Sequence, residues 1–112
     1  MMTVREVVES LGLTVRTPQS ALDSKVTGGV VCDLLSVVMS EASKGNLWVT
    51  VQCHPNIVAV AVVGGLAGVV VTQGMEPESE TLLKAEQEAI PILTTKASSF
   101  EVAGRLYSMM AG

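Results

Sequence analysis

The feature that most constrains the fold is the run of residues 57–71, which holds no charged or polar side chain. A helix that spans a membrane needs about 20 apolar residues, and this run is shorter. It is also interrupted by Gly64, Gly65 and Gly68. We therefore interpret the run as buried core. Its last part, GVVV, is typical of a strand that is buried on both faces of a sheet.

The first part of the run, residues 57–63, fits two structures. Its β-branched residues favour a strand, with Gly64 and Gly65 as a hairpin turn. Against this, Asn56 after Pro55 is a good N-cap for a helix. A helix also lets strands and helices alternate along the whole chain, so we predict a helix here.

The remaining segments alternate in the same way. Thr3 with Glu6 predicts a capping box, and Gly12 ends that first helix. Asp33 opens a second helix, which Lys44 and Gly45 end. Helices are predicted over 4–11, 33–44, 57–63, 77–89 and 98–110, and strands over 13–17, 25–31, 47–52, 68–73 and 90–95. The apolar faces of the second, fourth and last helices are predicted to comprise Leu34, Leu35, Val38, Met39 and Ala42; Leu82, Leu83, Ala85 and Ala89; and Phe100, Val102, Ala103, Leu106 and Met110.

Strand and helix alternation predicts an α/β fold, a mostly parallel sheet of four to five strands flanked by helices. At 112 residues the chain is most simply one domain over 1–112, with an N-terminal helix and strand in 1–21. The net charge of -4 and the 3% aromatic content show no basic or stacking surface, which argues against nucleic acid as a partner. Two cysteines without a secretory signal indicate a cytoplasmic protein, and no membrane contact is expected.

Polar side chains follow the predicted strands where an α/β sheet places its ligands. Ligands of such sheets bind at the carboxyl ends of the strands, beside helix N-termini that favour anions such as phosphate or carboxylate. The residues selected by this rule are Cys32 and Asp33; Gln52, Cys53, His54 and Asn56; Thr72 and Gln73; and Thr94, Thr95 and Ser98.

The adjacent Cys53 and His54 suggest chemistry, but neighbours on a strand point to opposite faces. We therefore favour a turn histidine that caps backbone groups over a catalytic base. The cysteines and the histidine do not have the sequence spacing of a zinc site, and no P-loop or dinucleotide-binding fingerprint is present. The pair Gly28 and Gly29 fits a phosphate cradle, a strand bulge or a close backbone approach. We predict no catalytic residue, no metal and no cofactor.

Taken together, residues 22–107 resemble the DRTGG domain. The most telling pieces are Thr27-Gly28-Gly29 followed by Asp33-Leu34-Leu35, a strand that ends before Asn56, Gly74 with Pro77, and IPILTT followed by Ser99-Phe100-Glu101. Of the residues that name the family, Asp23, Thr27, Gly28 and Gly29 match. No arginine precedes the threonine, and Lys25 is the nearest cation.

The resemblance implies an α/β domain that usually accompanies other domains. Such domains look like regulatory modules beside CBS pairs in certain inorganic pyrophosphatases and beside the catalytic part of long phosphotransacetylases. Free-standing members are often labelled as relatives of HPr serine kinase, whose P-loop this chain lacks. The resemblance also implies a homodimer and makes adenine nucleotides conceivable ligands.

We therefore expect a non-catalytic regulatory module that senses a nucleotide or a phosphorylated metabolite as a homodimer. The alternative is a protein-interaction subunit of a larger metabolic enzyme complex, without a small-molecule ligand. The helix over 57–63 and the last helix, with Tyr107, Met109 and Met110, are the candidate dimer faces. The predicted ligand-binding residues are Thr27, Gly28, Gly29, Asp33, Cys53, His54, Asn56, Thr72 and Gln73.

Overall fold

The computed structural model describes residues 2–18 and 21–111, and within them a single sheet has the strand order β1-β5-β4-β3-β2. The four strands β2 to β5 are parallel, and β1 pairs antiparallel with β5. This confirms the predicted α/β fold. The strands are β1 (Thr14–Val15), β2 (Gly28–Val31), β3 (Asn46–Thr50), β4 (Gly68–Val71) and β5 (Ile92–Thr94). The helices are α1 (Val4–Leu11), α2 (Leu35–Glu41), α3 (Asn56–Gly64), α4 (Ser79–Gln87) and α5 (Ser99–Ala111).

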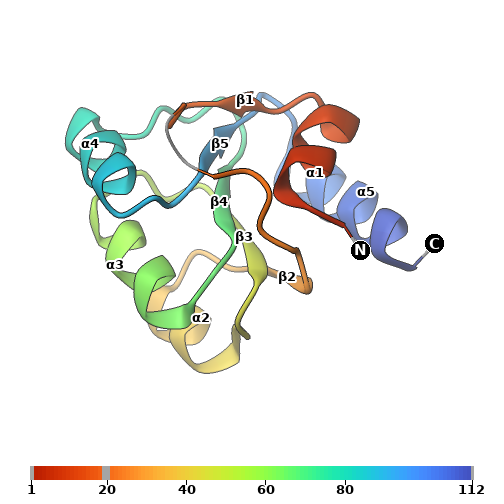
Figure 1. The fold of residues 1–112 in the computed structure, drawn as a ribbon, viewed down its shortest axis with the longest axis horizontal. Coiled ribbons are helices and arrows are strands. Elements are labelled where there is room, and N and C mark those ends of the chain that lie inside the picture. The colour runs from red at the N-terminus through yellow and green to blue at the C-terminus, as the bar shows by residue number, and fades with distance from the viewer. Residues whose placement is uncertain (1, 19–20, 112) are drawn as a thin grey trace.

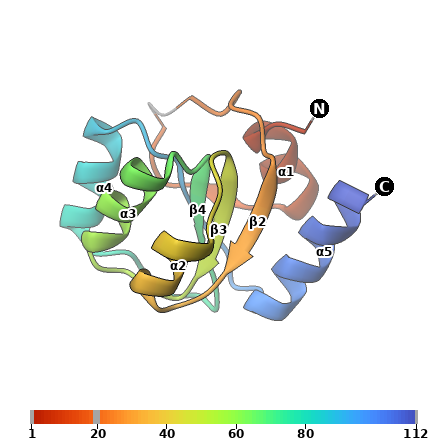
Figure 2. The ribbon, with the colours of Figure 1, turned by 90° about the horizontal axis from the view of Figure 1, so that it is seen from below.

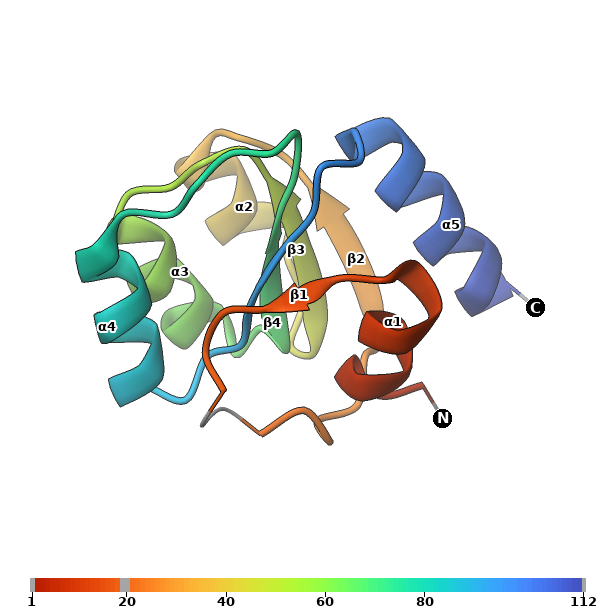
Figure 3. The same cartoon turned by 90° about the horizontal axis from the view of Figure 1, so that it is seen from above.

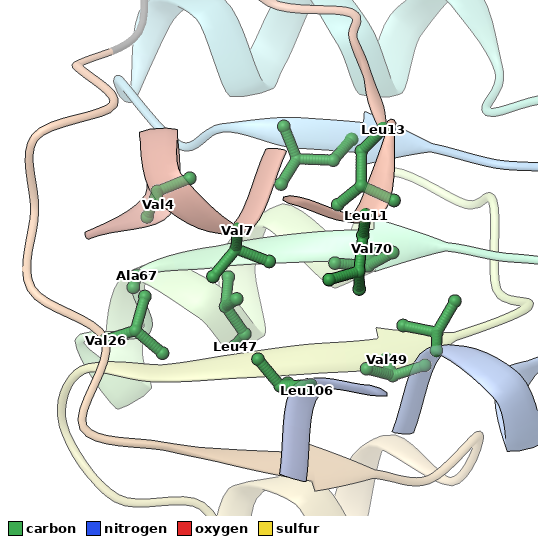
Figure 4. Close-up of a cluster of buried hydrophobic side chains, with 12 residues drawn as sticks. Val4, Val7, Leu11, Leu13, Val26, Leu47, Val49, Ala67, Val70 and Leu106 are labelled. Atoms are coloured by element: carbon green, nitrogen blue, oxygen red, sulfur yellow. The ribbon is translucent and has the colours of Figure 1, made fainter. Parts of the chain in front are cut away.

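Two layers of helices enclose the sheet. Figure 1 shows α2, α3 and α4 on one face and α1 and α5 on the other. Side chains alternate along β3, so that Trp48 packs with α3 on the first face while Leu47 and Val49 face α1 and α5. Figure 4 shows the second cluster, in which Val7 of α1 and Leu106 of α5 close over the sheet. Every residue of β3 and β4 is buried, so GVVV is a strand buried on both faces, as predicted. The earlier part of the apolar run is not wholly core, because Val62 and Val63 of α3 are exposed.

The ambiguous segment is a helix, as predicted, but Asn56 does not cap it. Pro55 occupies the N-cap position and already has helical backbone angles (φ -52°, ψ -23°), so Asn56 is the first residue of α3. The His54 ring caps the helix instead, because its Nδ1 accepts the Asn56 N–H at 3.0 Å. The predicted role of His54 as a capping residue of the turn is thus confirmed.

The second helix is shorter than predicted. It begins at Leu35, because the Asp33 carboxylate bonds to the end of β3 and not to the helix. It ends at Glu41, before the turn that holds Gly45 at φ +87°. Of its predicted apolar face Val38 is buried, whereas Leu34 and Met39 are exposed. The reason is position, since α2 lies beside the edge strand β2 and is covered on one side (Figure 2).

Three further predictions of apolar contact were wrong. Leu83 and Ala89 of the α4 region are exposed, whereas Ala85 is buried as predicted and Thr81 is buried as well. The helix begins at Ser79 and packs one face against α3, so Leu82 is partly buried while Leu83 faces solvent. On α5, Val102 and Leu106 are buried as predicted, but Phe100 is 90% exposed at the start of the helix, and Met110 is partly exposed.

The capping box is confirmed, with Thr3 Oγ1 accepting the Glu6 N–H and Glu6 accepting the Thr3 N–H. The glycine pair is a close approach and not a bulge, because β2 and β3 pair in continuous register from Gly28 to Val31. A Cβ on Gly28 would lie 3.1 Å from Asn46 Nδ2, and one on Gly29 would lie 3.1 Å from Leu106 Cδ2. Glycine therefore lets α5 pack directly on β2. Among the described residues, no helix is long and apolar enough to cross a membrane.

Candidate functional site

A crevice opens between the carboxyl ends of β4 and β5. The chain leaving β4 leads to α4 on one face of the sheet, while the chain leaving β5 leads to α5 on the other face. Figure 3 shows the two loops diverging from neighbouring strands. The chains leaving β2 and β3 turn to the same face as that leaving β4, so the direction changes only at this point. In open α/β sheets such a divergence is where ligands bind.

A cavity of about 200 Å³ lies at this crevice. It is smaller than the roughly 300–1,000 Å³ of pockets for drug-sized ligands. A small ion, a phosphoryl group or a carboxylate fits this size, whereas a whole nucleotide does not. The lining residues come from the start of β1, the loop after β4 and the end of β5: Thr14, Gly74, Met75, Glu76, Thr94, Thr95 and Lys96.

The charges around the cavity leave one cation available. Arg16 forms a two-pronged ion pair with Glu76, with its two terminal nitrogens 2.8 and 2.6 Å from the carboxylate oxygens. The hydrogen bond from Arg16 lowers the pKa of Glu76, and the same bond raises the pKa of Arg16. Lys96 makes no ion pair with any residue that the structure describes. The cavity therefore carries a net positive charge on a chain whose total charge is -4.

Hydrogen bonds between the two diverging loops hold the rim of the crevice. Gln73 and Gly74 both adopt left-handed backbone angles, with φ of +63° and +70°. This conformation is uncommon for a residue other than glycine and persists only where the surroundings enforce it. Here the Gln73 N–H donates to the Ala97 carbonyl at 2.9 Å, and the Gly74 N–H donates to the Thr95 carbonyl at 3.0 Å. The cavity is thus pre-formed by the backbone.

The side chains of Thr72 and Gln73 join β4 to the start of α5. The hydroxyls of Thr72 and Ser99 are 2.6 Å apart, and the Ser99 N–H donates to Gln73 Oε1 at 3.1 Å. Ser98 Oγ accepts the Glu101 N–H and so caps the helix. These groups face one another across the carboxyl edge, and their bonding capacity is largely taken up within the protein.

Asp33 joins β2 to the end of β3. Its Oδ1 accepts the Thr50 hydroxyl at 2.8 Å and the Val51 N–H at 3.0 Å. The Gln52 side chain returns a bond to the Asp33 carbonyl at 2.8 Å. Thr50 is buried, so its hydroxyl depends on this carboxylate. The arrangement gives Asp33 a structural role at the carboxyl edge.

Cys53 and His54 do not form a reactive pair. The Cys53 thiol is half-buried and donates to the Val51 carbonyl at 3.5 Å. Burial raises the pKa of this thiol, and the negative charges of Glu76 and Glu78 raise it further. Nucleophilic cysteines need the opposite shift. In His54 the Nδ1 lone pair accepts a backbone N–H, so the neutral ring carries its proton on Nε2. Within the described residues, no group of three His, Cys, Asp or Glu side chains could hold a metal ion.

The predicted ligand-binding residues fall at two ends of the sheet. Asp33, Cys53, His54, Asn56, Thr72 and Gln73 lie at the carboxyl edge. Thr27, Gly28 and Gly29 lie at the start of β2, about one strand length or 10 Å away. Thr27 is bonded there to the turn before β3, with its hydroxyl donating to the Lys44 carbonyl at 2.7 Å and accepting from Asn46 Nδ2 at 3.2 Å.

Sequence reasoning selected Thr94 and Thr95 but not the other lining residues of the cavity, Thr14, Gly74, Met75, Glu76 and Lys96, nor Arg16 beside it. Lys96 directly follows these threonines and could have been included by the rule that selected them. Glu76 and Thr14 carry no local signal. Arg16 was missed because it is 60 residues from Glu76 in the chain, and pairing over such a distance leaves no pattern in one sequence.

Comparison with known proteins places the chain in a family. A sequence model described as the DRTGG domain matches residues 6–109, so the chain belongs to the DRTGG domain family. No curated protein sequence matches it.

Among solved structures, the chain is similar to the crystal structure of the CBS and DRTGG domains of the regulatory region of Clostridium perfringens pyrophosphatase, complexed with the activator diadenosine tetraphosphate. The TM-score is 0.67 at 19% identity, over 93% of this chain and 45% of the other. This chain therefore spans less than half the length of that regulatory region, and the likeness is one of fold.

Proposed function

We propose that this DRTGG domain is a non-catalytic regulatory module that binds a small anionic group in the crevice between β4 and β5. The anion is a phosphorylated metabolite or the phosphate part of a nucleotide. The observation that carries the proposal is the cavity at the point where the two loops diverge, with Lys96 as its unpaired cation.

Charge and size together select the class of ligand. Glu76 would repel an anion, but Arg16 neutralises it through two short bonds. Lys96 then supplies the unneutralised positive charge of the cavity, and the hydroxyls of Thr94 and Thr95 also line it. A volume of about 200 Å³ admits a phosphoryl group, so the nucleoside part of a nucleotide would lie outside the cavity over the carboxyl edge.

Two observations favour binding over catalysis. The Cys53 thiol has a raised pKa, and the basic nitrogen of His54 is occupied by the backbone of α3. Membership of a family with a relative in the regulatory region of a pyrophosphatase agrees with a sensing role, although that relative carries its activator in a longer chain.

A thermal-shift series with AMP, ADP, ATP, acetyl phosphate and inorganic phosphate tests the proposal. A ligand present at about 100 times its Kd stabilises the native state by roughly 2.7 kcal/mol. In a domain of this size we expect the Tm to rise by roughly 10 °C. At least one phosphate-bearing compound is expected to give this rise, and chloride at equal ionic strength is not.

Two variants test whether the ligand-induced rise in Tm comes from binding in the cavity. Lys96→Met keeps the length of the side chain but removes the charge, and we expect it to abolish the shift. Lys84→Met removes an exposed cation from α4 and is expected to leave the shift unchanged. A flat response of the wild-type protein to all five compounds, or an equal shift in the Lys96→Met variant, would overturn the proposed site.

A further inference from the structure

The Arg16–Glu76 ion pair lies at the wall of the crevice between β4 and β5. Glu76 lines the cavity, and its two carboxylate oxygens accept hydrogen bonds from Arg16 at 2.8 and 2.6 Å. Two such parallel bonds are the way in which a guanidinium binds a carboxylate or a phosphate. An anionic group is therefore already bound at this wall, and it belongs to the protein itself.

The two partners of this pair are held differently. Arg16 directly follows β1, its backbone N–H donates to the Ile92 carbonyl at 2.8 Å, and its side chain is only 26% exposed. Glu76 lies in the loop from β4 to α4, and its side chain is 67% exposed. Figure 1 shows β1 beside this loop. The Glu76 carboxylate can therefore turn into solvent, while the Arg16 side chain is confined.

The Glu76 carboxylate can be exchanged for another anion at little cost. An exposed ion pair contributes little to stability, because water and salt screen its charges. A phosphoryl group carries more negative charge than a carboxylate and offers three oxygens, so it accepts the same two bonds from a guanidinium. A phosphoryl group that reaches Arg16 therefore competes directly with Glu76.

The cavity then has positions for two anionic groups. The first is the space of about 200 Å³ lined by Lys96, which makes no ion pair with any residue that the structure describes. The Glu76 carboxylate marks the second position, at Arg16. A ligand with one anionic group fills the first position and leaves the ion pair intact. A ligand with two adjacent groups fills both.

We propose that Arg16 is a second ligand-binding cation, which Glu76 occupies until a ligand displaces it. The site then prefers a ligand with two adjacent phosphoryl groups, such as the diphosphate part of a nucleotide, over a ligand with one. This inference rests on the proposed function and adds to it the class of ligand and the residue that selects it. Glu76 is an internal competitor, so a single phosphate makes no contact with Arg16.

Calorimetric titration of the whole chain with inorganic phosphate and with pyrophosphate, at physiological ionic strength, tests the proposal. Glu76→Gln keeps the shape of the side chain but weakens its hold on Arg16. We expect this variant to bind pyrophosphate about fivefold more tightly than the wild type, the upper end of what an exposed ion pair contributes. Its Kd for phosphate is expected to change by less than about twofold, since salt screens the remaining change in charge.

The double variant Arg16→Met with Glu76→Gln separates contact from charge, because it removes one charge of each sign and leaves the net charge of the wall unchanged. We expect it to bind phosphate like the wild type but pyrophosphate about fivefold more weakly. Asp23→Asn is the matched control, since Asp23 pairs with Arg5 at 3.1 Å in a similarly exposed position but does not line the cavity. This variant is expected to leave both Kd values unchanged.

The results distinguish this inference from the proposed function. An unchanged pyrophosphate Kd in Glu76→Gln, or equal pyrophosphate affinity of the double variant and the wild type, would overturn the role of Arg16 while phosphate binding at Lys96 stands. If the wild type binds neither compound, or Lys96→Met binds both as the wild type does, the inference and the proposed function fail together. Circular dichroism of each variant is expected to match the wild type, and Glu76→Gln alone decides if the double variant does not fold.

Discussion

Replacing Asp33 separates a structural hydrogen bond from a ligand contact. In the Asp33→Ala variant the Thr50 hydroxyl and the Val51 N–H both lose their acceptor, Oδ1 of the carboxylate. A hydrogen bond to a charged group contributes roughly 1.5–3 kcal/mol to stability. Because Asp33 is exposed, water can replace much of the bond to Val51, but the buried Thr50 hydroxyl has less access to water. We expect a loss of about 2 kcal/mol in the free energy of unfolding, or roughly 8 °C in Tm.

Asp33→Asn is the matched control, because the amide oxygen can accept the same two bonds without a charge. We expect it to lose less than about 1 kcal/mol. Both variants can be followed by urea unfolding at a fixed protein concentration through Trp48, the only tryptophan and a fully buried one. Equal stability of Asp33→Ala and wild type would refute the structural role, and equal losses in both variants would show that the charge matters and not the acceptor.

Two other residues give sharp expectations. His54→Ala removes the acceptor for the Asn56 N–H and is expected to destabilise the protein by about 1 kcal/mol, while Asn56→Ala changes stability by less than half as much; a reversed order in urea unfolding would restore Asn56 as the cap. Since burial raises the pKa of Cys53, its alkylation by iodoacetamide is expected to be slower at pH 8 than that of an unfolded cysteine and to keep accelerating above pH 9. Peptide mass spectrometry measures this rate, and a plateau below pH 8 would contradict the shift.

The order of elements could be predicted from the sequence because each signal was local. The capping box at Thr3, the valine run of β4 and the glycine at residue 12 act on neighbouring residues, and the structure has each of them in the predicted role. The alternation of strands and helices then determines a parallel sheet.

The wrong predictions concern residues whose environment is determined by contacts between segments far apart in the chain. Asp33 was expected to open a helix, but Thr50 and Val51 of the neighbouring strand bind its carboxylate. Leu83 and Phe100 were placed in the core from periodicity, yet both side chains are exposed in the structure. Periodicity identifies an apolar face but not how much of it another element covers.

The candidate site was predicted in part for the same reason. The rule for carboxyl ends of strands selected Thr94 and Thr95, which line the cavity. It could not distinguish which loops diverge, because that depends on α5 crossing to the face opposite α4. It therefore selected residues that bond within the protein, such as Thr72, and left out Lys96, which carries the free charge.

The most direct test of the central claim is a ¹H–¹⁵N NMR titration of the wild-type chain with the phosphate compound that gives the largest thermal shift. We expect saturable changes confined to the backbone amides around the crevice, at Gly74, Glu76, Thr95 and Lys96. Those of Thr27, Gly28 and Gly29 at the far end of β2 are expected to stay in place. Changes centred on the residues of β2, or no saturable change at the crevice, would contradict the account.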